Sequence, residues 1–446
     1  MKADPVNAGD GFAANRNPPG PPCQGGVRIA GPSPDKGRTG GVAVCFSRQS
    51  PLITMTSTPI HARHFAELDV LRFVAAVAVM LFHFTFLAWV MPESTAYRLS
   101  GGVLHFPELA PWTGAGWIGV QVFFVISGFV IAYSAEGASL ASFLRSRALR
   151  LLPAAWVCAS ATFLIAAGSG VAGDYLRSLV LSPVGPWVDP SYWTLGIELS
   201  FYGLVALLIA CGNDHRLPNR IHRLAWVLGV ASAAYWLLFW LAQAGEGEWR
   251  TFFLQHQEDR RLQLLLLPHG SFFALGICLR RASRQGFTPV LVAICAALML
   301  PCMAQIAAHN ALAVAKTGVA SGAAYPIGLW LAAMAFMVAA IRPGGAASTV
   351  GAGRLRALGL MTYPLYLLHQ VLGCLLLGVL AGWGLERYTT LACTVLVMMA
   401  LGALVSVGIE PWLRRRLDGC IAAVATAFPS GLPLPARGAI RREDAP

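Results

Sequence analysis

The chain has 446 residues, of which 56% are hydrophobic and only 12% are charged, and its formal net charge is +12. Soluble globular proteins carry about a quarter charged residues, so this composition excludes an ordinary soluble enzyme and indicates a membrane protein. The positive charge does not indicate a nucleic-acid partner, because the basic residues form short clusters between hydrophobic blocks rather than one patch.

The first 60 residues differ in composition from the rest of the chain. They are rich in proline and glycine and show no apolar periodicity, so we expect residues 1–60 to form a disordered N-terminal extension. Met55 stands just before the sequence becomes regular and is a candidate for the true translation start. The predicted transmembrane domain covers residues 65–415, and residues 416–446 are expected to be a cytoplasmic tail.

Hydrophobic blocks of about 20 residues, the length that crosses a bilayer as a helix, recur along the domain. Arginines cluster in alternate loops, as is typical of cytoplasmic loops. The sequence therefore predicts an all-α, polytopic transmembrane helical bundle with about ten spans and both termini in the cytoplasm. The predicted spans are 69–90, 116–134, 151–168, 194–211, 224–242, 264–280, 288–308, 321–341, 358–380 and 388–410.

The first span contains two ionisable residues, Arg72 and His83. Ionisable groups at membrane depth are costly unless they pair or line a cavity, so a functional role is the default interpretation. They are eleven residues apart, about three helical turns, which puts them on nearly the same face and roughly 16 Å apart along the axis. Asp69, one turn before Arg72, is an alternative partner for that arginine.

The second, fourth and ninth spans add further polar side chains. Glu198 lies at a depth in the fourth span where it could meet His83, and a carboxylate beside an imidazole would make that imidazole a better general base. Glu198 could instead be a structural partner of an arginine. His369 could equally be a satisfied core histidine. The remaining polar residues expected to face the bundle interior are Gln121, Ser127, Tyr363, Tyr366 and Gln370.

Arg147 and Arg150 lie on one helical face just before the third span. Paired guanidinium groups suit a phosphorylated ligand, but their spacing alone is also compatible with a role in membrane orientation only. A metal site is not predicted, because the sequence has neither H-E-x-x-H nor C-x-x-C spacing. The cysteines in apolar blocks are read as small core residues.

These same segments resemble the integral-membrane acyltransferase 3 family, which includes bacterial O-antigen and exopolysaccharide O-acetylases. The motifs occur in the family's order: Leu68-Asp-x-Leu-Arg72 with His83 eleven residues later, Gly119-Val-x-x-Phe-Phe-Val-Ile-Ser-Gly-Phe129, Arg147-x-x-Arg150-Leu-x-Pro153, Trp193-Thr-Leu-x-x-Glu198-x-x-Phe-Tyr202 and Gly359-x-x-x-Tyr363-x-x-Tyr366-x-x-His369. Two departures are apparent. Gln121 stands where an acidic residue is common, and a C-terminal hydrolase-like domain is not expected.

The resemblance implies transfer of an acyl group, usually acetyl, from cytoplasmic acyl-CoA to a hydroxyl of an envelope or secreted glycan. It implies that Arg72 and His83 form the essential pair and that Arg147 and Arg150 serve the CoA end of the donor. The resemblance also leads us to expect a multi-pass protein of the plasma (inner) membrane, with acyl-CoA, a glycan or lipid-linked sugar and the bilayer as partners and no tightly bound cofactor.

In the predicted mechanism, Glu198 orients His83, which deprotonates the acceptor or accepts the acyl group itself; the sequence does not separate these routes. The group expected to position the acceptor or stabilise the oxyanion comprises Tyr363, Tyr366, His369, Gln121 and Ser127. A membrane transporter of an acylated sugar or small anion is the alternative function, because transporters also use buried ionisable residues.

Overall fold

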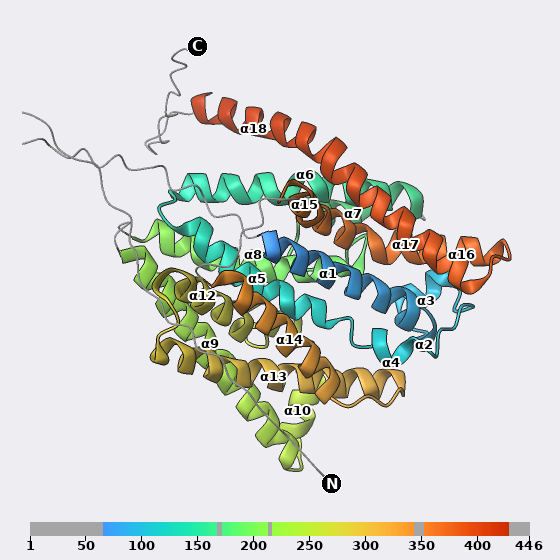
Figure 1. The fold of residues 1–446 in the computed structure, drawn as a ribbon, viewed down its shortest axis with the longest axis horizontal. Helices are drawn as coiled ribbons and strands as arrows, with labels where there is room; N and C mark the ends of the chain where they lie inside the picture. The colour runs from blue at the N-terminus through green and yellow to red at the C-terminus, as the bar shows by residue number, and fades with distance from the viewer. Residues whose placement is uncertain (1–65, 167–171, 213–215, 343–351, 428–446) are drawn as a thin grey trace, which may run out of the picture. The chain divides into compact units, whose positions relative to one another are not determined.

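A computed structural model describes residues 66–166, 172–212, 216–342 and 352–427, all of which belong to one compact unit, Ala62–Pro446. Within these ranges every regular element is a helix (Figure 1). Nine helical segments of the described residues are long and apolar enough to cross a membrane. The prediction of an all-α polytopic bundle is therefore confirmed.

The elements follow one another with short connections. The first half of the described chain forms α1 (Ala66–Phe82), η1 (His83–Leu87), α2 (Ala88–Val90), α3 (Thr95–Ser100), α4 (Ala110–Thr113), α5 (Ile118–Ala135), α6 (Leu140–Ala166), α7 (Ala172–Leu179), η2 (Pro190–Tyr192) and α8 (Trp193–Ala210). The second half forms α9 (Leu217–Ala244), α10 (Glu248–His256), α11 (Arg260–Leu264), α12 (Gly270–Gln285), α13 (Pro289–Thr317), α14 (Ala324–Ile341), α15 (Ala352–Leu368), η4 (His369–Gly373), α16 (Cys374–Gly382), α17 (Arg387–Ala403), η5 (Leu404–Ile409) and α18 (Glu410–Ala427).

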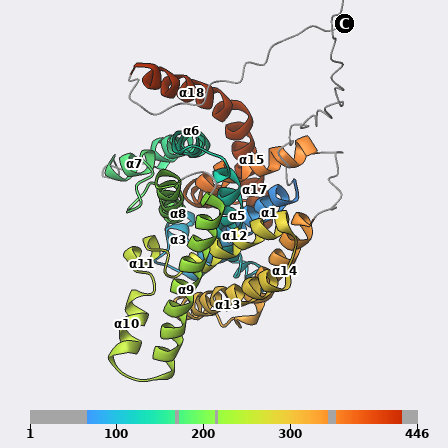
Figure 2. The same cartoon turned by 90° about the vertical axis from the view of Figure 1, so that its left-hand side faces the viewer.

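Helix α12 corresponds to the sixth predicted span, 264–280, but it is shorter than that span and begins later. Its 16 residues extend about 24 Å, which is less than the hydrocarbon thickness of a bilayer. The predicted start instead falls in α11 and in a turn where Leu266 has a positive φ of 61°. The residues from Gly270 to Leu279 are all buried. Helix α12 packs against α5, α9 and α13, and Figure 2 shows it in the interior beside α5 and α9. Its hydrophobic residues therefore serve the interior of the bundle.

Helices α1 and α15 form the other half of the interior. Helix α1 packs against α5 and α15, and α15 in turn contacts α6 and α17. Figure 1 shows α1 crossing the middle of the bundle, with α18 along one edge. Helix α1, which carries Arg72, thus lies beside the helices that carry Gln121 and Tyr363, although these residues are far apart in the sequence.

The predicted domain limits fall partly outside the described residues. Residues 1–60 and 428–446 lie there, so the N-terminal extension and most of the predicted tail stay predictions. The predicted boundary at residue 415 falls inside α18, which continues to Ala427. The orientation of the bundle in the membrane also stays a prediction.

Two glycines allow α5 and α12 to approach each other closely. A Cβ at Gly276 would collide with the Val125 carbonyl oxygen of α5, and a Cβ at Gly128 would collide with the Phe273 carbonyl of α12. Backbone atoms cannot move aside as side-chain ends can, so the contact requires glycine at both positions.

We expect Gly276→Ala to destabilise the protein, because the added methyl group would push α12 away from α5. Overpacking of this kind costs about 1–3 kcal/mol. Thermal unfolding in detergent should show a lower midpoint for this variant. The control is Gly328→Ala in α14, where an added Cβ meets no atom within 4 Å. Equal midpoints for the two variants would contradict the close approach.

Candidate active site

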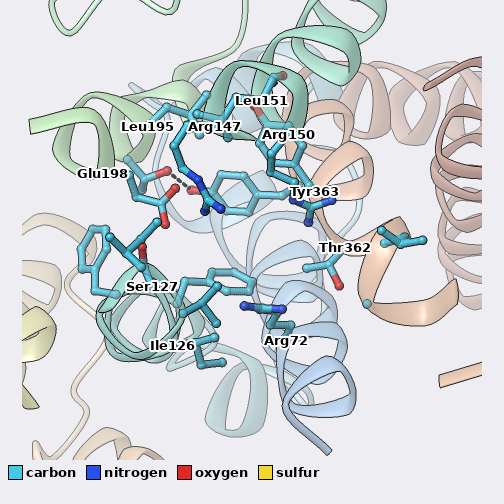
Figure 3. A pocket seen from close by; sticks show the side chains of 18 of the residues that line it. Arg72, Ile126, Ser127, Arg147, Arg150, Leu151, Leu195, Glu198, Thr362 and Tyr363 are labelled. Atoms are coloured by element: carbon cyan, nitrogen blue, oxygen red, sulfur yellow. Dashed lines mark hydrogen bonds between the residues drawn. The ribbon is translucent and has the colours of Figure 1, made fainter. Parts of the chain in front are cut away.

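The first of two large cavities, here called the arginine cavity, has a volume of about 420 Å³. Helix α1 contributes Arg72, α6 contributes Arg147 and Arg150, and α8 contributes Glu198. Figure 3 shows the three guanidinium groups turned into the cavity, with Glu198 and Ser127 on another wall. The lining also includes Asp69, Tyr202, Arg356, Tyr363, Tyr366 and Arg414.

Five arginines and two carboxylates line this cavity, so its charge is positive. Arg72 pairs with Asp69 at 3.1 Å, which confirms the alternative partner predicted for this arginine. The Arg147 guanidinium stacks over the rings of Phe143 and Tyr202. The arrangement keeps the guanidinium groups together despite their mutual repulsion, and it is suited to a ligand with several negative charges.

Arg150 has hydrogen-bonding capacity to spare. Its guanidinium lies 5.7 Å from the centroid of the Tyr363 ring. Its Nη1 atom is buried and has no hydrogen-bond partner among the described residues. A buried donor without an acceptor costs about 1–3 kcal/mol, more when it is charged, and an anionic ligand would remove that cost.

The second cavity, here called the histidine cavity, has a volume of about 370 Å³ and is lined by His83, Gln121 and Gln370, among others. The two cavities share Val120 and Tyr366 as lining residues, so they meet at these side chains. The Tyr366 hydroxyl is held by Thr194 Oγ1 at 3.1 Å and by the Ser191 carbonyl at 3.2 Å. A ligand that occupied both cavities would lie beside Tyr366.

His83 contacts a second histidine instead of a carboxylate. His83 Nδ1 lies 2.8 Å from the Val79 carbonyl oxygen and 3.2 Å from His369 Nε2. His369 Nδ1 lies 2.7 Å from the Tyr366 carbonyl oxygen, so it must be the N–H donor. In a neutral His369 the other nitrogen, Nε2, is then an acceptor.

These contacts define the tautomer of His83. Both neighbours of its Nδ1 are acceptors, so Nδ1 carries the proton and Nε2 carries the lone pair. His83 lines the histidine cavity, whereas His369 is only 1% exposed and stands behind it. The pair therefore presents one basic nitrogen, that of His83, to the cavity.

Each histidine begins a short π-helical segment, η1 for His83 and η4 for His369. Such segments insert an extra residue into a helix and are frequent at functional sites. Asp189 holds η4 in place: its Oδ2 accepts the Val371 N–H at 2.9 Å, and its Oδ1 accepts the Ser191 N–H at 2.8 Å. Burial raises the pKa of Asp189 to about 6, whereas these hydrogen bonds act in the opposite direction.

The predicted pair of Glu198 and His83 is wrong. Glu198 lines the arginine cavity and accepts a hydrogen bond from the Tyr202 hydroxyl at 3.2 Å, one helical turn away. The prediction estimated depth from the ends of two spans, but depth does not fix the face of the helix. Glu198 lines the same cavity as Arg147 and Arg150 of α6, and His369 takes the place predicted for Glu198 beside His83.

The structure separates the group predicted to position the acceptor or the oxyanion. Ser127 and Tyr363 line the arginine cavity, Gln121 lines the histidine cavity, and Tyr366 lines both. His369 lines neither and orients His83. The sequence analysis overlooked Asp189, although an acidic residue directly before a proline at a helix start is a recognisable cap. Among the described residues, no group of three or more potential ligands is placed to hold a metal ion.

A family model described as an acyltransferase domain matches residues 65–410. The chain belongs to this acyltransferase family. Nodulation protein 10 from Rhizobium leguminosarum bv. viciae is 28% identical over 211 residues, which cover 39% of this chain and 51% of that protein. The O-acetyltransferase OatA from Staphylococcus aureus (strain NCTC 8325 / PS 47) is 26% identical over 198 residues, which cover 37% of this chain and 31% of OatA. No solved structure shows a significant match.

In this member of the acyltransferase family, we expect Asp189→Ala to be strongly destabilising. The substitution leaves the N–H groups of Ser191 and Val371 buried without their acceptor, at a cost of at least about 2 kcal/mol. Thermal unfolding in detergent measures the loss. The control is Asp174→Ala on α7, which removes only a surface ion pair with Arg177 and should cost less than about 1 kcal/mol. A loss no larger than that of the control would contradict the role of Asp189.

Proposed function

We propose that the protein is an O-acyltransferase that moves an acyl group, acetyl in the simplest case, from acyl-CoA to a hydroxyl group of a glycan. The observation that carries the proposal is the junction of two unlike cavities beside a histidine with a free basic nitrogen. The family supplies the reaction class, and the name of the relative O-acetyltransferase OatA supports an acetyl group transferred to oxygen.

The arginine cavity would bind the donor. CoA carries a diphosphate and a 3′-phosphate, and Arg147 and Arg150 offer planar guanidinium groups that pair well with phosphate oxygens. The unused Nη1 of Arg150 supports this assignment. Arginine clusters near the ends of α6, α15 and α18 fit the cytoplasmic side of a plasma membrane under the positive-inside rule, where acyl-CoA is present.

The acyl end of the donor would reach His83 past Tyr366. The CoA arm that carries the thioester is thin and uncharged, so it can pass through a protein interior that excludes the phosphates. Arg72 and its partner Asp69 line the arginine cavity, and they would form part of the wall of this path. The thioester carbonyl would then lie beside the histidine cavity.

At that point His83 Nε2 would take the proton of the acceptor hydroxyl as its oxygen attacks the thioester carbonyl. The tetrahedral intermediate collapses, the C–S bond breaks, and the CoA sulfur leaves with the proton returned by His83. Alternatively, His83 Nε2 accepts the acyl group first and passes it to the hydroxyl. Both routes use the same nitrogen and the same orientation by His369.

We expect His83→Ala to lower the rate of acyl transfer at least about 100-fold, because general bases contribute 10²- to 10⁴-fold. The measurement is release of CoA from acetyl-CoA by purified protein in lipid nanodiscs, with glycan fragments as acceptors. The control is His256→Ala on α10, whose Nδ1 has the same kind of bond to the carbonyl four residues earlier. A His83→Ala protein with full activity would remove this histidine from the mechanism.

We expect Arg150→Gln to raise the KM for acetyl-CoA about 10- to 100-fold, because it removes charge-assisted hydrogen bonds to phosphate. The KM for S-acetyl-pantetheine, which has no such phosphates, should not change. Steady-state kinetics with the two donors test this difference. The control is Arg145→Gln on the same helix, where the guanidinium pairs with Asp418 outside the cavity. Equal effects of Arg150→Gln on both donors would contradict a phosphate site.

A further inference from the structure

The histidine cavity has a lining that the donor does not explain. Around His83 it contains the aromatic residues Trp117, Trp187, Trp193 and Trp236 and the amide side chains of Gln121, Gln257, Gln263, Gln305 and Gln370. Ligand pockets usually combine an aromatic or apolar wall with a few placed polar groups that fix the orientation of the ligand. The composition of this lining indicates a binding site of its own.

The polar centre of this site is a pair of buried glutamines. Gln121 of α5 donates through Nε2 to Gln305 Oε1 of α13 at 3.4 Å, and each side chain is only 3% exposed. The other head-group atom of Gln121, Oε1, is buried with no hydrogen-bond partner among the described residues. Buried amides are usually satisfied, so this acceptor is available to a hydroxyl donor in the cavity.

The aromatic wall lies close to this pair. Trp117, just before α5, packs against His309 of α13 with ring centroids 4.3 Å apart. Both rings line the cavity, and the residues stand four positions from Gln121 and Gln305 on the same two helices. The C–H face of a pyranose ring is apolar and packs well on such aromatic surfaces, whereas its hydroxyls need amide partners at the rim.

The charged residues of the lining are already engaged. Arg260 donates to the Pro183 and Trp193 carbonyls and to Gln263 Oε1, at distances between 2.6 and 3.0 Å. Glu258 pairs with Lys316 at 2.6 Å. A carboxylate or phosphate brought to the glutamine pair would lose its hydration and gain no guanidinium in exchange. A neutral ring with hydroxyl groups would lose much less.

We propose that the histidine cavity binds an uncharged sugar ring of the acceptor, with Gln121 and Gln305 hydrogen-bonding its hydroxyl groups and Trp117 and His309 packing against its face. The proposal rests on the proposed acyltransferase function, because it places that sugar beside His83. It assigns ligands of different charge to the two cavities: an anion to the arginine cavity and a neutral alcohol to the histidine cavity.

Binding of two matched sugars tests the proposal without turnover. Methyl glucoside and methyl glucuronide share a ring and differ by one carboxylate. The full chain in nanodiscs would be titrated with each, and the fluorescence of the lining tryptophans would report occupancy. We expect saturable binding of methyl glucoside and at least tenfold weaker binding of methyl glucuronide. Equal or tighter binding of the glucuronide, or no saturable binding of the glucoside, would overturn the proposal.

A substitution in the glutamine pair then assigns the binding to this cavity. Gln305→Leu keeps the approximate size of the side chain and removes its hydrogen bonds, so glucoside binding should weaken about tenfold. The control Gln243→Leu, on α9 and outside the lining, should leave binding unchanged. Unchanged binding by Gln305→Leu would overturn the proposal.

The donor reaction separates this test from the proposed function. The control Gln243→Leu, outside both cavities, should release CoA from acetyl-CoA with glycan acceptors at the wild-type rate. A wild-type protein that binds the glucoside but never releases CoA, with any acceptor, would refute the acyltransferase proposal and leave a sugar-binding cavity. A protein that releases CoA with glycan acceptors yet binds both methyl sugars equally would overturn the neutral-sugar proposal and leave the acyltransferase proposal standing.

Discussion

The site depends on the contact between two imidazoles, that of the buried His369 and that of His83, which is only partly buried. Where water is excluded, each N–H must find an acceptor, and a histidine without a fixed partner would alternate between tautomers. Here the carbonyls of Val79 and Tyr366 take the Nδ1 protons of His83 and His369, and His369 Nε2 takes a share of the first. Of the acceptors in this pair, only His83 Nε2 is left with a free lone pair, and this nitrogen belongs to the histidine that lines the cavity. Backbone carbonyls thus do what a carboxylate does in many other catalytic sites.

The same constraint explains the local irregularity of the helices. A regular α-helix hydrogen-bonds its own carbonyls and leaves little freedom to place a side chain across the bundle. The π-helical segments at His83 and His369 change the register at the residues that must meet. Such segments leave some backbone groups without their regular helical hydrogen bonds. One of these groups, the Val371 N–H, donates to Asp189 instead. Within the described part of the chain, no carboxylate contacts the histidine pair directly. The nearby carboxylate of Asp189 instead hydrogen-bonds the backbone of the segment that carries His369.

Much of the fold could be predicted from the sequence, because span length and hydrophobicity are set by the bilayer. The partner of Arg72 could also be predicted, since Asp69 is one turn away on the same helix. Helix α12 differed because its apolar residues face protein on all sides and need not span the membrane. The partner of Glu198 could not be predicted, because its depth along the helix axis does not determine which face of the helix it occupies. The π-helical segments change the direction in which His83 and His369 point, and the regular 3.6-residue period does not predict this change. The contact between the two histidines could therefore not be predicted from the sequence.

Tyr366 lies where the arginine cavity and the histidine cavity meet. Its hydroxyl is fixed by Thr194 and Ser191, and its ring packs edge-on against Phe123 at 5.8 Å, so this side chain forms a firm part of the boundary. In the proposed mechanism, donor phosphates held by the arginines on one side could not follow the acyl group through an apolar boundary, since their desolvation would cost far more than any contact returns. A donor anchored in this way can present only its uncharged end to His83. In this proposal, the different charge of the two cavities and the fixed position of Tyr366 between them act together to keep the donor phosphates away from His83.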